Sequence, residues 1–158
     1  MNTTGTTTTT TPPGTARLAA LIRAKLQVLE ILTRLSRRQL ELIAGGDSGA
    51  LVKLLTAKET VLAQLQAIER QLHPFRDEDP ESRVWSSPAE RAACQRDADR
   101  ANALLAEALE LERQAEAAMI NRRDATAAAL SAAQGAADAR SAYAGSSPTV
   151  AGVLEALG

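Results

Sequence analysis

The chain has 158 residues and a formal net charge of −1, and hydrophobic residues make up 45% of it while aromatic residues make up only 2%. This length suits one domain with a modest core, and an apolar content drawn mainly from Leu, Ala, Val and Ile favours helices over sheets. The near-neutral charge argues against broad attraction to nucleic acid or anionic lipid. The single Cys94 excludes an internal disulfide.

The first residues, 1–14, are of low complexity, with an unbroken threonine run from Thr6 to Thr11 followed by Pro12-Pro13-Gly14. This composition predicts a disordered tail. Thr15 can then cap a helix whose first residue is Ala16. The start of the chain lacks the basic and apolar regions of a secretory signal, and no apolar run reaches the roughly 20 residues that span a bilayer. We therefore expect a cytoplasmic protein without stable membrane insertion.

The first predicted helix carries apolar residues at seven-residue intervals, and the double glycine Gly45-Gly46 predicts its end near Ala44. These residues are Leu21, Val28, Leu35 and Leu42. Lys25 lies within this apolar stripe, and we expect its ammonium group to reach water.

A second helix is predicted to begin after Asp47 or Ser48, either of which can cap it, and to stop at His73 because Pro74 follows. Its stripe contains Lys58, whose ammonium group we also expect to reach water. The short connection between two long helices predicts an antiparallel hairpin. Residues 74–87 are then predicted to form a loop, anchored on the hairpin by Phe75 and Trp85.

The third helix has the clearest start signal, because Ser87-Pro88-Ala89-Glu90 is a capping box with proline at the first helical position. Uninterrupted to Gly145, it would be on the order of 80 Å long, against about 40–45 Å for each earlier helix. Its second half, from about Ile120, should therefore overshoot the hairpin or bend at Asn121 or Gly135. That half keeps an apolar stripe made mostly of alanine, so we expect it to be mobile alone and ordered by a partner.

These elements predict an all-α fold in which a long antiparallel helical hairpin packs with a third long helix as a three-helix, coiled-coil-like bundle. The bundle domain would cover residues 15–145. The last residues, 146–158, would form a flexible C-terminal segment with a short amphipathic stretch.

Catalytic chemistry has few residues to use. The only histidine, His73, is interpreted as a helix-boundary residue, and Cys94 as a packed small residue because no second histidine could activate it. Neither a Glu-x-x-His metal motif nor a phosphate-binding glycine loop is present. The sequence therefore predicts neither an enzyme nor a metal or cofactor site.

Charged clusters on the helices are interpreted as solvated surface. Glu107, Glu110 and Glu112 form one such cluster, and the doublets Arg37-Arg38 and Arg122-Arg123 have acidic neighbours but no aromatic residue to stack a base. We expect no nucleic acid partner.

Several larger side chains near the C-terminus remain as candidates for partner binding. They could fold back to complete the core of the hairpin, or they could form an apolar surface that accepts the amphipathic helix of a partner. These candidates are Met119, Leu130, Tyr143, Val150, Val153 and Leu154.

The run from Leu40 to Glu59 joins the end of a helix, a Gly-Asp turn, a leucine-rich stretch and the pair Lys58-Glu59. In these features it resembles the FlgN-type flagellar export chaperones. Asn121, and Tyr143 followed closely by Gly145, also resemble the C-terminal region of that family. The resemblance covers residues 18–145.

The resemblance implies an ATP-independent cytosolic chaperone that binds the terminal helix of flagellar hook-associated (filament-junction) proteins. Such a chaperone would prevent early polymerisation and deliver these proteins to the export gate of type III secretion. Tyr143 would then contact the gate or the cargo, and the chaperone itself would be a monomer or a weak dimer. Two alternatives stay open: a structural coiled-coil protein that self-associates without cargo, and a helical-bundle enzyme.

Overall fold

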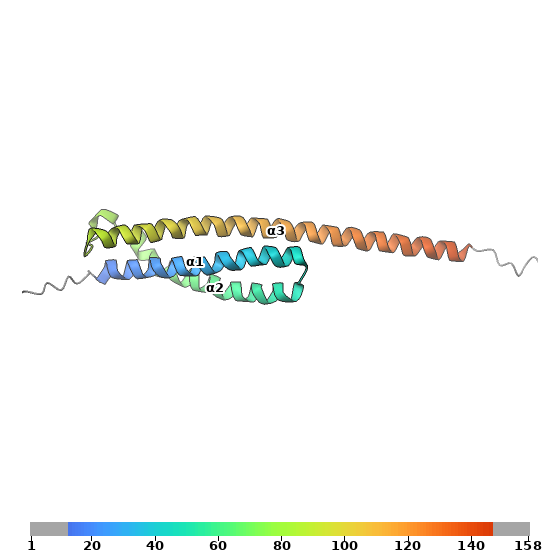
Figure 1. Ribbon diagram of the computed structural model, residues 1–158, viewed down its shortest axis with the longest axis horizontal. Coiled ribbons are helices and arrows are strands. Elements are labelled where there is room, and N and C mark those ends of the chain that lie inside the picture. The colour runs from blue at the N-terminus through green and yellow to red at the C-terminus, as the bar shows by residue number, and fades with distance from the viewer. Residues whose placement is uncertain (1–12, 147–158) are drawn as a thin grey trace, which may run out of the picture. The chain divides into compact units, whose positions relative to one another are not determined.

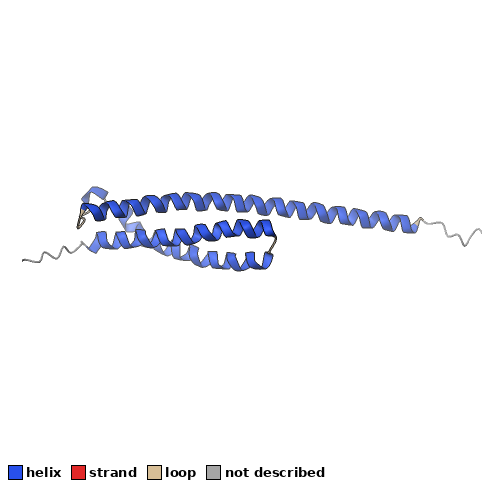
Figure 2. Ribbon diagram, in the orientation of Figure 1, coloured by secondary structure: helices blue, strands red, loops and turns tan. Residues whose placement is uncertain are grey.

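The computed structural model describes residues 13–146, and this part of the chain is all-α (Figures 1 and 2). The elements follow the order α1 (Pro13–Gly45), α2 (Ser48–Arg76), the short 3-10 helix η1 (Pro80–Ser82) and α3 (Pro88–Gly145). The predicted fold class, with three long helices, is confirmed.

The chain divides into two units, Met1–Ala118 and Met119–Gly158. The first unit contains α1, α2, η1 and the beginning of α3, and it holds all of the buried core residues. The second unit contains the rest of α3, which we call the distal segment (residues 119–146). Every residue of the distal segment is exposed.

The turn between α1 and α2 has the predicted chemistry. Gly46 adopts a φ of 78°, a left-handed conformation that favours glycine, and its N–H donates to the Leu42 carbonyl oxygen at 3.0 Å. The Asp47 carboxylate then accepts from the Ala50 N–H at 2.9 Å and caps α2. Of the two candidate caps, the structure selects Asp47.

Contacts between side chains define the directions of the helices in the first unit. Lys25 of α1 pairs with Glu69 of α2 at 2.5 Å, and the Cα atoms of these two helices approach within 8 Å, so they run antiparallel (Figure 1). Along α1 and α3, Glu30 pairs with Arg100 at 3.5 Å, and Arg37 pairs with Glu107. From the first pair to the second, the residue number rises by seven on each helix, so α1 and this part of α3 run parallel.

The core of the first unit is built from large residues on α1 and α2 and small residues on α3. The buried residues of α3 recur every seven positions: Cys94, Ala101, Ala108 and Ala115. Ala101 and Ala108 pack in a cluster around Leu29 and Val61, and Cys94 packs in a second cluster around Leu18 and Leu72. Small side chains in this row let α3 lie on the hairpin while its flanking leucines fill the sides.

The start of α1 differs from the prediction. The helix begins at Pro13 rather than Ala16, because proline suits the first helical position. Thr15 is therefore not the cap; it is buried inside the helix, and its hydroxyl donates to the Val84 carbonyl oxygen at 3.0 Å. Residues 1–12, where most of the predicted tail falls, lie outside the described residues.

The end of α2 also differs, since the helix continues through Pro74 to Arg76. Proline in the last turn removes one backbone hydrogen bond, and two contacts offset that loss. Phe75 packs on the cluster around Leu18 and Leu72, and Arg83 Nη2 donates to the Phe75 carbonyl oxygen at 2.5 Å. Arg83 lies eight residues after Phe75, so the helix-stop signal at Pro74 does not include this contact.

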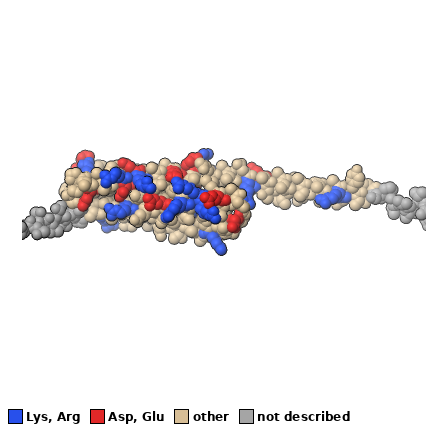
Figure 3. All heavy atoms as spheres, in the orientation of Figure 1, with Lys and Arg blue, Asp and Glu red and all other residues tan. Residues whose placement is uncertain are grey.

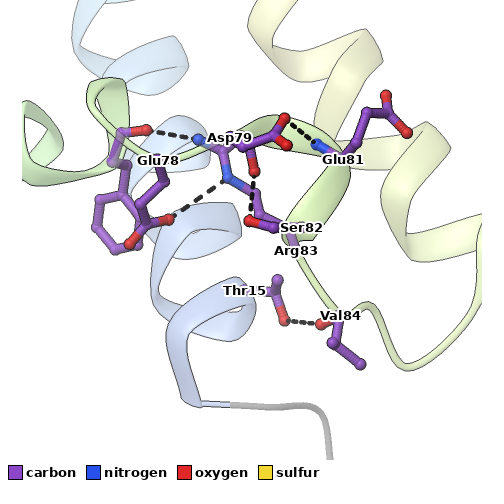
Figure 4. A network of polar contacts seen from close by, with 8 residues as sticks. Thr15, Glu78, Asp79, Glu81, Ser82, Arg83 and Val84 are labelled. Atoms are coloured by element: carbon purple, nitrogen blue, oxygen red, sulfur yellow. Dashed lines mark hydrogen bonds and ion pairs between the residues drawn. The ribbon is translucent and has the colours of Figure 1, made fainter.

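The connection to α3 is held by polar groups at the open end of the hairpin (Figure 4). Asp79 accepts from the Glu81 N–H at 3.0 Å, and Arg83 Nε lies 3.6 Å from the Glu78 carboxylate. Trp85 packs against the same cluster as Phe75, which confirms the predicted contact of both aromatic residues with the hairpin, although Phe75 makes it from α2 rather than from the loop.

The serine cap of the predicted capping box at the start of α3 is also present. The Glu90 N–H donates to Ser87 Oγ at 3.2 Å, and the helix begins at Pro88 as expected.

Candidate partner-binding surfaces

Lys58 is buried in the first unit, with only 5% of its surface exposed. Its Nζ donates to Gln39 Oε1 at 2.6 Å and also to the Glu112 carboxylate, whose Oε1 accepts from Ser36 Oγ at 2.9 Å. These four residues join all three helices. The prediction that the Lys58 ammonium reaches water is therefore wrong, and Lys25 likewise pairs with Glu69. Both carboxylates come from other helices, which the apolar stripe alone does not reveal.

The three glutamates predicted to form a solvated cluster behave differently from one another. Glu107 pairs with Arg37 across the helices, and Glu112 bonds to Lys58 and Ser36. Glu110 stays on the surface, and hydrogen bonds from Arg113 and Gln114 lower the pKa of its carboxyl to about 2. Glu110 and Glu112 are both exposed, as interpreted, although Glu112 also pairs with the buried Lys58, and Glu107 is half-buried.

An apolar groove of about 350 Å³ lies between α2 and α3 in the first unit. Three leucines of its walls are exposed: Leu55, Leu62 and Leu109. The complete lining comprises Leu32, Leu55, Lys58, Glu59, Leu62, Leu65, Leu105, Ala108, Leu109 and Glu112. Sequence reasoning missed this surface because both helix stripes were assigned to the core.

Two of the three charged residues that line this groove pair with each other, and the third does not. Lys58 and Glu112 pair with each other where α2 and α3 face each other. The Glu59 carboxylate is exposed, and within residues 13–146 it has neither an ion pair nor a hydrogen bond. The groove therefore combines an apolar lining with one unpaired negative charge.

Three of the six residues predicted to bind a partner lie in the distal segment, within the described residues. Met119, Leu130 and Tyr143 are 44%, 61% and 85% exposed. On a helix with 3.6 residues per turn, Met119 and Leu130 lie within about 20° of each other, whereas Tyr143 lies about 140° from Leu130. The structure thus places two of these residues on one face and the third on another. Val150, Val153 and Leu154 lie outside the described residues.

Cys94 and His73, the two groups considered for catalysis, differ in burial. Cys94 is buried in the cluster around Leu18, and burial raises the pKa of its thiol above the ordinary value of 9.0. His73 is exposed in the last turn of α2. Within the described ranges, no group of three His, Cys, Asp or Glu side chains could hold a metal ion.

Arginines of the basic doublets pair with carboxylates. Arg37 pairs with Glu107, Arg38 pairs with Glu41 at 2.6 Å, and Arg123 pairs with its neighbour Asp124 at 3.2 Å. The space-filling view shows acidic and basic side chains interspersed on the face of the bundle (Figure 3). This face carries no continuous basic patch of the kind that binds nucleic acid.

None of the helices in residues 13–146 combines the length and the apolar character that crossing a bilayer requires. Comparisons of the chain with protein-family models, with curated proteins and with solved structures found no match.

Proposed function

We propose that this protein is a non-catalytic export chaperone that binds flagellar hook-associated subunits through the distal segment of α3 and keeps them unpolymerised for type III secretion. The observation that carries the proposal is the unbroken exposure of residues 119–146, which include Met119, Leu130 and Tyr143. Exposed apolar side chains on a preformed helix are what a partner helix can cover. The sequence resemblance to FlgN-type chaperones supplies the cargo class.

The mechanism is burial of exposed apolar side chains of the distal segment, without chemistry. Covering about 800 Å² of apolar surface would contribute on the order of 20 kcal/mol before costs. Most of this is offset by lost translational freedom and by ordering of the cargo helix. Because the distal segment consists largely of alanine, which buries little area per residue, we expect a moderate affinity.

The proposal is tested by mixing the purified chain with each purified hook-associated subunit of the source cell. Binding is measured by isothermal titration calorimetry, and polymerisation of the subunit by light scattering. We expect one subunit class to bind and its polymerisation to stop at equimolar chaperone.

The doubly substituted variant Leu130→Asp with Tyr143→Asp should retain the helical circular dichroism signal and lose cargo binding at least tenfold, because it places charges on exposed apolar positions. The matched control is Val52→Asp on α2, a residue that is exposed as Leu130 is. If none of the subunits binds, or if the double variant binds as tightly as the native chain, the proposal is wrong.

A further inference from the structure

The groove between α2 and α3 continues the core of the first unit. Leu32 and Ala108, which belong to the cluster around Leu29 and Val61, also line the groove. The residues that line its walls recur at the seven-residue spacing that is typical of packed helices. Leu55 and Leu62 are seven residues apart on α2, and Leu105 precedes Glu112 by seven on α3. Walls of this kind accept the side chains of one more helix.

The possible occupants differ in shape and chemistry. Residues 1–12 contain, besides Met1 and Pro12, only Asn, Thr and Gly, so they lack a leucine-like face. If the grooves of two copies faced each other, both surfaces would be concave. An empty space would then remain between them, and such a contact would be poorly packed. A helix is convex, so its apolar side chains fit the shape of the groove. A basic residue on such a helix could pair with the negative charge of Glu59.

The distal segment is a helix of that description. Ile120 and Ala127 are seven residues apart, and Arg123 and Leu130 interleave with them at the same spacing, so all four lie on one face. All four are exposed. Within residues 13–146, the one ion pair of Arg123 is with the neighbouring Asp124 at 3.2 Å. This exposed pair contributes little, and Arg123 can exchange Asp124 for another carboxylate.

We propose that the groove between α2 and α3 is the docking site for the distal segment of a second copy of this chain. Ile120 and Leu130 enter between the leucines of the groove, and Arg123 pairs with Glu59. The two surfaces are different parts of the chain, so the contact is heterologous. It does not rest on the proposed cargo, although Leu130 takes part in both, so cargo and a second copy compete for that side chain.

The association is weak and reversible. Three exposed leucines in the groove, with two large apolar residues entering it, form an interface well below the ~800 Å² per partner of a stable complex. We therefore expect a dissociation constant above about 1 μM. If the protein is a chaperone, this self-association would cover the apolar side chains of the distal segment until cargo displaces the second copy.

The test is sedimentation velocity of the full chain from about 1 to 500 μM. We expect the native chain to show a concentration-dependent increase in mass. Leu62→Glu with Leu109→Glu, on the groove, and Ile120→Asp with Leu130→Asp, on the helix, should each weaken association at least tenfold. Val52→Glu is the matched control, because Val52 and Leu109 are both 63% exposed and only Leu109 lines the groove.

Mixing the two double variants distinguishes this contact from others. The groove variant still has an intact helix and the helix variant an intact groove, so an equimolar mixture should form a heterodimer although each variant alone is monomeric. If the distal segments instead paired with each other, the groove variant would still self-associate. A native chain that stays monomeric throughout, or a mixture that does not associate, overturns the proposal.

The charge contact has its own test. Arg123→Glu should weaken self-association several-fold, and adding Glu59→Arg should restore it. If the double reversal does not restore association, Arg123 does not meet Glu59 and the proposed docking is wrong. Cargo binding is read separately by calorimetry, and Tyr143→Asp should affect cargo without affecting self-association. Failure of the proposed function is therefore distinguishable from failure of this contact.

Discussion

Lys58 brings a positive charge into a core that is made mainly of aliphatic residues, and its partners come from the two other helices. Gln39 lies on α1 and Glu112 on α3, and Ser36 bonds to the same carboxylate oxygen that accepts from Lys58. A buried charge without its partner is costly, whereas an apolar residue in its place is tolerated. The network therefore ties the placement of α3 on the hairpin to one carboxylate.

We predict that Glu112→Gln lowers the free energy of unfolding by about 2 kcal/mol, less than for a fully buried pair because Glu112 is partly exposed. Lys58→Met should cost less, and adding it to Glu112→Gln should recover most of the loss. Urea denaturation of the four proteins measures this cycle. Additive losses in the double variant would show that the two side chains do not stabilise each other.

Cys94 gives the first unit a pH dependence on the alkaline side. Burial raises the pKa of its thiol above 9.0, so the folded chain holds the proton that the unfolded chain releases. The resulting stability is fully present below pH 9.0 and is lost as the pH rises from there through the folded pKa.

We predict that the native chain loses more stability between pH 8 and pH 10.5 than Cys94→Ala does, and that native Cys94 reacts slowly with a thiol reagent at pH 8 because it is buried. Thermal melts across this range and the rate of thiol labelling measure the two effects. Equal alkaline losses in both proteins would contradict the assigned role of the thiol.

At the scale of elements, α3 carries one seven-residue row with two compositions. In the first unit, the row Cys94, Ala101, Ala108 and Ala115 is buried. The same seven-residue row continues in the distal segment with Arg122, Ala129, Ala136 and Tyr143, all of which are exposed. The helix persists through Gly135, so helix propensity rather than burial maintains it there.

We predict that Gly135→Ala raises the stability of the distal segment by up to about 1 kcal/mol, since alanine restricts the unfolded chain more than glycine does. An added Cβ at Gly135 meets nothing within 4 Å. Gly46→Ala is the opposite control, because the φ of 78° makes a side chain there destabilising by about 1 kcal/mol. Circular dichroism melts distinguish the two; a destabilised Gly135→Ala would contradict the prediction.

At the scale of the whole molecule, the two units differ in what holds them together. In the first, side chains from three helices share a core and ion pairs connect the helices. Along residues 119–146 of the second, every side chain is exposed, and side-chain hydrogen bonds include local ones such as that of Thr126 Oγ1 to the Arg122 carbonyl oxygen. Local opening of such a segment costs little free energy.

We predict that backbone amides of residues 120–146 exchange with deuterium much faster than those of residues 18–72. Mass spectrometry of peptic fragments after seconds to hours of labelling makes the comparison. At high protein concentration, a second copy that covers the distal segment should slow its exchange, and Leu62→Glu with Leu109→Glu should remove that effect. Uniform protection of both regions in dilute solution would contradict this account.

Local signals in the sequence determined the helices and most of their ends. The Gly45-Gly46 stop, the Asp47 cap and the Ser87 capping box act within a few residues, so composition and spacing were sufficient to predict them. Cys94 was likewise interpreted from the sequence as a packed small residue, and the structure buries it.

Tertiary structure alone decided which polar groups meet. Lys58 reaches Glu112 across 54 residues of chain, Thr15 reaches Val84 across 69, and Arg83 stabilises an α2 end that Pro74 should have shortened. The groove between α2 and α3 also depends on how two helices are spaced rather than on either stripe. A single sequence records the periodicity of each helix, but the energy of a buried charge or an open groove depends on neighbours that only the folded chain brings together.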